Sequence, residues 1–198
     1  MTLADRLRVA LARERGGLEL LTGDHSELDE RAADTLTPAA VLVPVTDRAE
    51  PGVILTLRAA SMRTHAGQIA FPGGRIDAGD RDAVAAALRE AEEEIGLPAP
   101  LVQVAGAADR YRTVTGFDVT PVIGVVPPDL PLRPAEAEVA AVFEAPFAFL
   151  LDRANHVRAH TDWRGRRRDF WEIRWGDHRI WGATAAMIVN LARRLRWS

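Results

Sequence analysis

The spacing of apolar residues changes several times along the chain, and each change marks an expected helix or strand. Between residues 3 and 21, leucine, valine and alanine recur among arginines and acids, and the first part of this stretch suits an amphipathic helix. Gly16-Gly17 should end that helix. The polar and acidic stretch from Gly23 to Asp34 is expected to form a loop or a short second helix.

Short apolar runs bounded by turn residues predict strands. They are expected at Ala40–Val45, Val53–Leu57, Val102–Ala105, Tyr111–Thr115, Val119–Val126 and Phe170–Trp175. Four prolines between residues 127 and 134 indicate a long exposed loop. Beyond it we expect a helical turn at Phe147–Leu151 and a closing helix at Gly182–Leu195. Strands and helices alternate without a regular βαβ rhythm, which predicts an α/β (α+β) fold with a mixed sheet covered by helices.

The segment from Asp82 to Ile95 has the clearest helical pattern. Its apolar residues recur at steps of four, three and four and give one stripe for the core: Val84, Leu88, Ala91 and Ile95. Gly96 and Pro98 should end this helix.

Three glutamates share another face of the same helix. Glu90, Glu93 and Glu94 stand at i, i+3 and i+4, so their Cβ atoms are about 5–6 Å apart. Carboxylates are unfavourable in the last turns of a helix, because the helix dipole is negative there and like charges repel. A hard dication held by several oxygens would offset this cost, whereas a solvated acidic face is the ordinary alternative. Glu92 should point away into solvent.

A glycine-rich turn, Phe71-Pro72-Gly73-Gly74, precedes the helix. Two consecutive glycines allow a close approach of the backbone or a positive φ. Alone, such a pair is typical of an ordinary turn. The spacing between this turn and the glutamates therefore decides what it means.

Turn and helix together read Gly74, fourteen residues, and then Arg89-Glu90-Ala91-Glu92-Glu93-Glu94-Ile95-Gly96-Leu97. This resembles the Nudix box, whose second half is Arg-Glu-apolar-x-Glu-Glu-x-Gly-apolar, and every specified position of that half is met. The gap is one residue longer than in the general box, and Asp80 stands near a position where the box has Glu. For Asp80 an N-cap of the helix is at least as good an interpretation.

The resemblance implies a Nudix fold, a mixed sheet sandwiched between helices, and a site for Mg²⁺ or Mn²⁺. The implied metal ligands are Glu90, Glu93 and Glu94, with the carbonyl of Gly74 as a candidate fourth. Arg89 would hold the acids in place by a charge-assisted bond. Clustered metal ions supply the charge neutralisation and activated water that diphosphate cleavage needs.

A general base is expected either within the box, at Glu90, or outside it, because many Nudix enzymes use an additional acid. Three acids of the later loop and strand region are candidates: Glu136, Glu138 and Glu144. Of these, Glu138 is slightly favoured.

Residues 54–74 resemble the signature of the coenzyme A diphosphatase subfamily: Leu-Leu-Thr-x-Arg-Ser/Ala, then Arg, His-x-Gly and Phe-Pro-Gly-Gly. Ile54 in place of the first Leu is the one mismatch. The resemblance covers roughly residues 38–195. The substrate-binding residues that it implies are Arg58, Arg63, His65, Gly67 and Gln68. Arginine suits phosphate recognition through its planar fork, although a solvated Arg58 and a satisfied loop His65 are the ordinary interpretation of each residue alone.

The expected function is therefore divalent-metal-dependent hydrolysis of coenzyme A to 3′-phosphoadenosine 5′-phosphate and 4′-phosphopantetheine. Two alternatives remain. One is a Nudix hydrolase of ADP-ribose, NADH or another nucleoside diphosphate derivative. The other is a nucleotide-binding sensor module without catalysis, which the intact glutamate cluster disfavours.

Composition narrows the partners and the setting. The 198 residues, 47% of them hydrophobic and 27% charged, suit one Nudix domain at 37–198 behind an N-terminal helical extension at 1–36. With no cysteine, a metal must be held by oxygen or imidazole. The net charge of −3 gives no reason to expect nucleic acid. No membrane span or secretory segment is evident, so we expect a cytoplasmic monomer or homodimer acting on a small-molecule substrate.

Overall fold

The computed structural model describes residues 1–13, 16–23, 36–62, 65–163 and 166–195. Its helices are α1 (Leu3–Ala12), α2 (Ala83–Ile95), α3 (Phe147–Leu151) and α4 (Ala183–Leu195), with 3₁₀ turns at Ala99–Leu101 and Arg153–Asn155. Its strands are β1 (Thr37–Thr46), β2 (Gly52–Arg58), β3 (Ile69–Ala70), β4 (Gly73–Arg75), β5 (Gln103–Ala107), β6 (Tyr111–Arg112), β7 (Phe117–Val126), β8 (Val139–Pro146), β9 (Val157–Trp163), β10 (Arg166–Trp175) and β11 (His178–Trp181).

The strands form a large mixed sheet and a small antiparallel one. In the part of the chain that the structure describes, the large sheet has eight strands along the order β3-β2-β1-β7-β5, with β4 on β1, β6 on β7 and β8 on β2. Strands β1 and β7 run parallel over their whole length, and the other pairs of this sheet are antiparallel. The small sheet has the order β11-β10-β9. The expectation of a mixed sheet covered by helices is confirmed.

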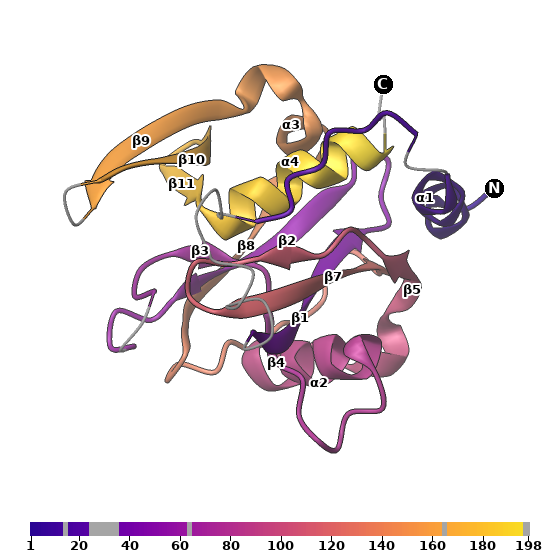
Figure 1. Cartoon of the computed structure of the whole chain (residues 1–198). Helices are drawn as coiled ribbons and strands as arrows, with labels where there is room; N and C mark the ends of the chain where they lie inside the picture. Colours follow the sequence, from indigo (N-terminus) through magenta and orange to yellow (C-terminus); the bar gives the residue numbers. More distant parts are fainter. Residues whose placement is uncertain (14–15, 24–35, 63–64, 164–165, 196–198) are drawn as a thin grey trace.

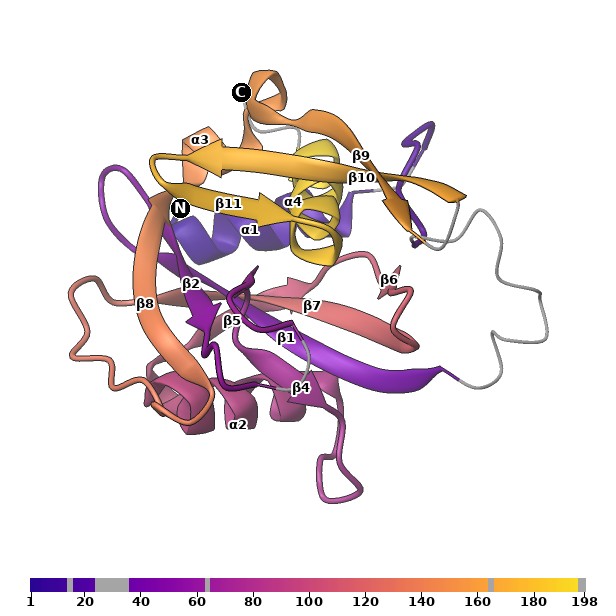
Figure 2. The same ribbon diagram turned by 90° about the vertical axis from the view of Figure 1, so that its left-hand side faces the viewer.

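Helices cover both faces of the large sheet. Helix α2 lies on one face, whereas α1, α4 and the small sheet lie on the other (Figures 1 and 2). Successive side chains of β1 point to opposite faces of the sheet: Leu42 packs in the core beneath α2 and Val43 in the core that includes α1 and α4. A strand buried on both faces explains the near-continuous apolar run of β1.

Most of the expected elements are confirmed, with α2 and α4 within one residue of their predicted limits. Strands β1 and β10 begin three and four residues before their predicted starts, and two other predictions were wrong at an end. Helix α1 stops at Ala12, before the glycine pair, because Arg13 is already extended. The strand expected at Tyr111–Thr115 has only two residues. Thr113 instead forms a turn, because it accepts hydrogen bonds from the backbone N–H groups of Gly116 and Phe117.

Five strands were not predicted: the short β3, β4 and β11 and the longer β8 and β9. Strand β8 is rich in alanine and glutamate, which are depleted in strands, and it is held by pairing with β2. Strand β9 is mostly polar and pairs with β10. The loop or helix expected at Gly23–Asp34 lies almost wholly outside the described residues. The division at residue 36 stays a prediction, although α1 buries Leu3, Leu7 and Leu11 in the same core as α4.

No helix among the described residues is both long enough and apolar enough to cross a membrane.

Candidate active site

The ends of α2 fix where its glutamates lie. Asp82 caps the N-terminus, because its Oδ1 accepts a hydrogen bond of 2.8 Å from the N–H of Ala85. Gly96 ends the helix in the left-handed conformation, with φ 64°. Helix α2 packs on β1 and β4, so the last turns of the helix face β4, the strand that contains Gly73 and Gly74. Sequence and structure therefore agree on the extent of this helix.

The glycine pair lets β4 pass between β1 and α2. A Cβ atom on Gly73, whose φ is 157°, would lie 2.4 Å from the carbonyl oxygen of Ala40. A Cβ atom on Gly74 would lie 2.6 Å from the carboxylate of Glu90. Both distances are shorter than any real contact of a side chain. The positive φ that such a pair allows is found at Gly73, and the group that approaches Gly74 is a glutamate of the helix.

Arg89 links the acids of α2 to the loop before the helix. Its Nε and Nη2 donate to the two carboxylate oxygens of Asp80, at 3.0 and 2.9 Å. Its Nη1 donates to Glu90 at 2.9 Å and to Glu93 at 3.2 Å. The hydrogen bond from Arg89 is the main reason why the pKa of Asp80 is lowered. The interpretation of Asp80 as the N-cap was wrong: Asp82 caps the helix, and Asp80 anchors Arg89 in a two-point contact.

Glu94 is the most deeply buried of the three glutamates, at 5% exposure. Its Oε2 accepts a hydrogen bond of 3.1 Å from the N–H of Gly73, and its Oε1 lies 3.8 Å from Nη1 of Arg58. Burial raises the pKa of Glu94 to about 7, although Gly73 and Arg58 act in the opposite direction. The charge of this carboxylate is therefore poorly compensated by the protein.

Glu90 and Glu93 differ in exposure. Burial raises the pKa of Glu90 despite the hydrogen bond from Arg89. The side chain of Glu93 is 61% exposed. Among the residues that the structure describes, no three acids or histidines converge on one point as a ready-made metal site. The site thus holds hard oxygen donors on neighbouring turns of one helix, with Arg89 between two of them.

Of the expected substrate-binding residues, Arg58 lies next to the glutamates. Besides its contact with Glu94, its Nη2 lies 3.0 Å from the sulfur of Met62, and its buried Nε has no hydrogen-bond partner among the described residues. Arg58 thus places a guanidinium, with one buried donor unused, beside the carboxylate cluster. The contact between Arg58 and Glu94 could not be predicted from local sequence patterns, because the two residues belong to elements far apart in the chain.

The other expected substrate residues belong to the loop between β2 and β3. His65 is exposed with φ 59°, and its Nδ1 lies 2.9 Å from Oε1 of Gln68. The N–H of Gly67, also at positive φ, donates to the carbonyl of Arg58. These bonds shape the loop, and no described contact joins them to the glutamates. Arg63 lies outside the described residues.

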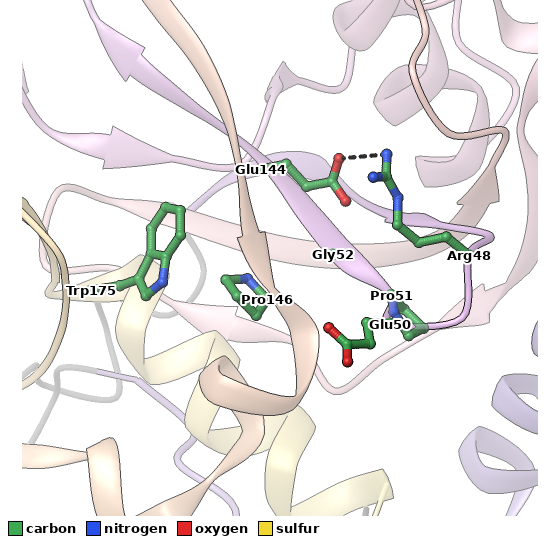
Figure 3. Close-up of a pocket in the computed structure, with 7 residues that line it drawn as sticks. All are labelled: Arg48, Glu50, Pro51, Gly52, Glu144, Pro146 and Trp175. Atoms are coloured by element: carbon green, nitrogen blue, oxygen red, sulfur yellow. Dashed lines mark hydrogen bonds and ion pairs between the residues drawn. The ribbon is translucent and has the colours of Figure 1, made fainter.

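The three candidate acids outside the box lie in different surroundings. The carbonyl of Glu138 accepts a hydrogen bond of 2.8 Å from the N–H of Ala59, the residue after Arg58, and the charge of Glu138 contributes to the raised pKa of Glu94. Glu136 is exposed. Glu144 accepts a hydrogen bond of 2.6 Å from Thr46 and pairs with Arg48 at 3.1 Å, in a pocket of about 380 Å³ beside the β1–β2 turn (Figure 3). Glu144 thus interacts with Thr46 and Arg48 and not with the glutamates of α2. Glu138 remains the candidate for the additional acid.

A family model described as the NUDIX domain matches residues 36–165. This range covers more than half of the chain and includes the glycine pair, α2 and Glu138, so the chain belongs to the Nudix family. The "uncharacterized Nudix hydrolase NudL" of Cronobacter sakazakii is 49% identical over 158 residues, which are 79% of this chain and 82% of the relative. The protein of the same name from Escherichia coli strain K12 is 46% identical over 157 residues, again 79% and 82% of the two chains.

The fold comparison agrees with the family. A MutT/nudix family protein from Enterococcus faecalis matches 96% of this chain and 68% of its own, with a TM-score of 0.52 at 16% identity, which shows a shared fold. The chain has the Nudix fold and is a hydrolase of phosphoanhydride bonds in nucleoside diphosphate derivatives.

Proposed function

We propose that this hydrolase cleaves the diphosphate bond of coenzyme A and releases 3′-phosphoadenosine 5′-phosphate and 4′-phosphopantetheine. Acyl and oxidised coenzyme A are further candidate substrates. The contact of Arg58 with Glu94 carries the proposal, because it joins the segment that resembles coenzyme A diphosphatases to the glutamates of the box. A signature residue beside the reacting groups is expected to contact the substrate.

Mg²⁺ or Mn²⁺ is the cofactor that the proposal requires, and the donors suit such a cation. Glu90, Glu93 and Glu94 would hold it, with the carbonyl of Gly74 as the candidate fourth ligand. Carboxylate and carbonyl oxygens are the donors that these cations prefer. The raised pKa values of Glu90 and Glu94 indicate negative charge that the protein leaves poorly compensated. When bound, the dication supplies neutralisation of phosphate charge and a more acidic water.

The remaining steps fall to side chains of the chain itself. Arg89 would keep Glu90 and Glu93 oriented, since it already donates to both. Glu138, or Glu90 as the alternative, would orient a water molecule and accept its proton. The water oxygen bonds to one phosphorus, the bond from that phosphorus to the bridging oxygen breaks, and each product leaves with a terminal phosphate.

Phosphate recognition would begin at Arg58 and continue along the loop that follows it. The guanidinium of Arg58 can donate to a diphosphate oxygen, which is a contact that arginine makes well. We assign further substrate contacts to Arg63, His65, Gly67 and Gln68 on the basis of the subfamily signature.

A substrate panel tests the proposal. Coenzyme A, ADP-ribose and NADH are incubated separately with the protein and Mg²⁺ or Mn²⁺, and the products are separated by chromatography; a parallel set contains EDTA. We expect 3′-phosphoadenosine 5′-phosphate from coenzyme A, the highest kcat/KM for coenzyme A, and no turnover in EDTA. A higher kcat/KM for ADP-ribose or NADH would overturn the substrate assignment. Metal-independent cleavage would overturn the cofactor.

A further inference from the structure

A second pocket lies on the other side of the large sheet from α2. Its volume is about 440 Å³, and its walls come from residues 17–19, the 3₁₀ turn after α3, β10 and α4. Figures 1 and 2 show these elements on the face of the sheet opposite α2. Four of its lining residues are cationic or aromatic, and we call it the arginine–tryptophan pocket: Arg153, His156, Trp171 and Arg193.

Strand register and helix spacing bring the pocket's groups together. Arg158 of β9 is directly opposite Trp171 of β10, so the two side chains share one face of the small sheet. The guanidinium of Arg158 lies 5.0 Å from the indole centroid. From α4, the guanidinium of Arg193 lies 5.8 Å from the same ring. One indole thus holds two cations, and both are within the range of a cation–π contact.

The positive charge of this pocket is poorly neutralised. Arg193 donates to the backbone carbonyl of Glu19, and within the described ranges neither Arg153 nor Arg193 forms an ion pair with a carboxylate. Burial lowers the pKa of Arg193, and the charges of Arg153 and Arg158 lower it further. The guanidinium of Arg193 therefore lies in surroundings that disfavour its positive charge.

The acids around the pocket are engaged or exposed. Asp169 lies 4.0 Å from Arg158 but also pairs with Arg167 at 3.1 Å. Asp152 accepts a hydrogen bond from the N–H of Ala154. Glu19 is exposed, and its charge acts on Arg193. Glu19 lines the pocket, but among the described residues none of these three carboxylates forms an ion pair with Arg153 or Arg193.

An unused donor adds a second, independent observation. The Nε1–H of Trp171 is buried, and it has no hydrogen-bond partner among the described residues. A buried donor without an acceptor is uncommon and costs stability. Trp171 lines the pocket together with Arg153 and Arg193, so the environment of its indole N–H is expected to respond to an anion bound there.

We propose that the arginine–tryptophan pocket binds a phosphate group, either inorganic phosphate or the terminal phosphate of a phosphomonoester. Phosphate has oxygens in several directions and suits guanidinium donors that come from separate elements. Because guanidinium groups already lie over the indole, a base stacked on Trp171 is disfavoured. The site is separate from the glutamates of α2 and does not depend on the substrate proposed for them.

The indole N–H of Trp171 provides a local readout. The full-length protein is labelled with ¹⁵N, its indole resonance is assigned by comparison with Trp171→Phe, and inorganic phosphate is titrated at constant ionic strength in EDTA. We expect a saturable shift of this resonance. Arg193→Gln and Arg153→Gln should each weaken the apparent Kd about tenfold, since each removes a charge-assisted hydrogen bond. Arg133→Gln removes an exposed charge on the α2 side and should leave the Kd unchanged.

Arg153→Gln protects the test against a folding defect, because Arg153 is exposed and holds no other described side chain. A titration with AMP distinguishes the two sources of phosphate. A tighter Kd for AMP than for inorganic phosphate assigns the site to a phosphomonoester, and the reverse order assigns it to the free ion. A shift that never saturates with either ligand, or equal Kd values for the Arg153, Arg193 and Arg133 variants, would overturn the proposal.

Discussion

Gly74 shows how one absent side chain positions a carboxylate of the site. The space where its Cβ would lie is taken by the carboxylate of Glu90, at 2.6 Å. Glu90 is in turn held by Arg89. A glycine here is therefore a requirement of the site's geometry and not simply of a turn.

Gly74→Ala tests this requirement. The added methyl group must displace the carboxylate of Glu90, so we expect kcat to fall at least tenfold; because that carboxylate ends a flexible side chain, the free energy of unfolding should fall by about 1 kcal/mol or less. Hydrolysis assays and urea unfolding measure the two effects. Gly79→Ala is the matched control, since nothing lies within 4 Å of a Cβ built there. Equal activity of the two variants would contradict the role given to Gly74.

For single residues, the glycine pair could be interpreted from the sequence, whereas one aspartate could not. The positive φ that the pair allows is found at Gly73. Asp80 and Asp82 are two positions apart, and both are favoured N-cap residues, so local preference could not separate them. What separates them is the side chain of Arg89, which reaches Asp80 from nine positions further along the chain.

At the scale of elements, α2 owes its predictability to a pattern that is local and complete. The apolar stripe, the glycine after its last turn and the aspartate before its first turn all lie within one stretch of sequence. Strands β8 and β9 had no such pattern, because what holds them is pairing with β2 and β10. The contact between Arg58 and Glu94 was out of reach for the same reason, since it joins β2 to α2.

The two aspartates before α2 should separate stability from catalysis. Asp82→Ala removes the N-cap and should lower the free energy of unfolding by about 1 kcal/mol while activity changes little. Asp80→Ala frees Arg89 from its anchor, so the orientation of Glu90 and Glu93 is lost and kcat should fall about tenfold or more. Thermal unfolding and steady-state assays on both variants give the comparison. A larger kcat loss for Asp82→Ala than for Asp80→Ala would refute this division.

The β10–β11 hairpin carries a pH-dependent contribution to stability. Glu172 is buried on β10 and accepts hydrogen bonds from Arg174 at 2.5 Å and Arg179 at 2.6 Å. Burial acts to raise the pKa of Glu172, but the bonds from Arg179 and Arg174 outweigh it and the pKa is lowered. The folded state therefore favours the ionised carboxylate. The resulting stabilisation is present above pH 4.5, the ordinary pKa, and is lost as the pH falls through the lower folded value.

We expect Glu172→Gln to lower the free energy of unfolding by about 1–3 kcal/mol at pH 7. The difference from the wild type should shrink towards about pH 3, because the wild-type carboxyl is then increasingly protonated. Urea unfolding at a series of pH values measures the difference. Glu50→Gln, which changes an exposed acid, should show no such trend. A difference that stays constant from pH 7 to pH 3 would be incompatible with this account.

For the whole molecule, the sequence predicted a mixed sheet between helices but not its connectivity. The parallel pairing of β1 with β7 joins residues about eighty positions apart, and only the folded chain fixes their register. The arginine–tryptophan pocket could not be predicted either, because its walls come from residues near both ends of the chain. Motifs within one helix or one turn could be predicted from the sequence, whereas sites assembled from distant elements could not.

Two neighbouring glutamates of α2, Glu92 and Glu93, give a direct comparison in coenzyme A hydrolysis. Glu93 belongs to the cluster held by Arg89, whereas Glu92 is an exposed residue one position earlier. Each is changed to Gln, and kcat/KM is measured with Mg²⁺ or Mn²⁺ in excess. We expect a loss of about a hundredfold or more for Glu93→Gln and near wild-type activity for Glu92→Gln. Equal activity of the two variants would contradict a metal-dependent active site at this cluster.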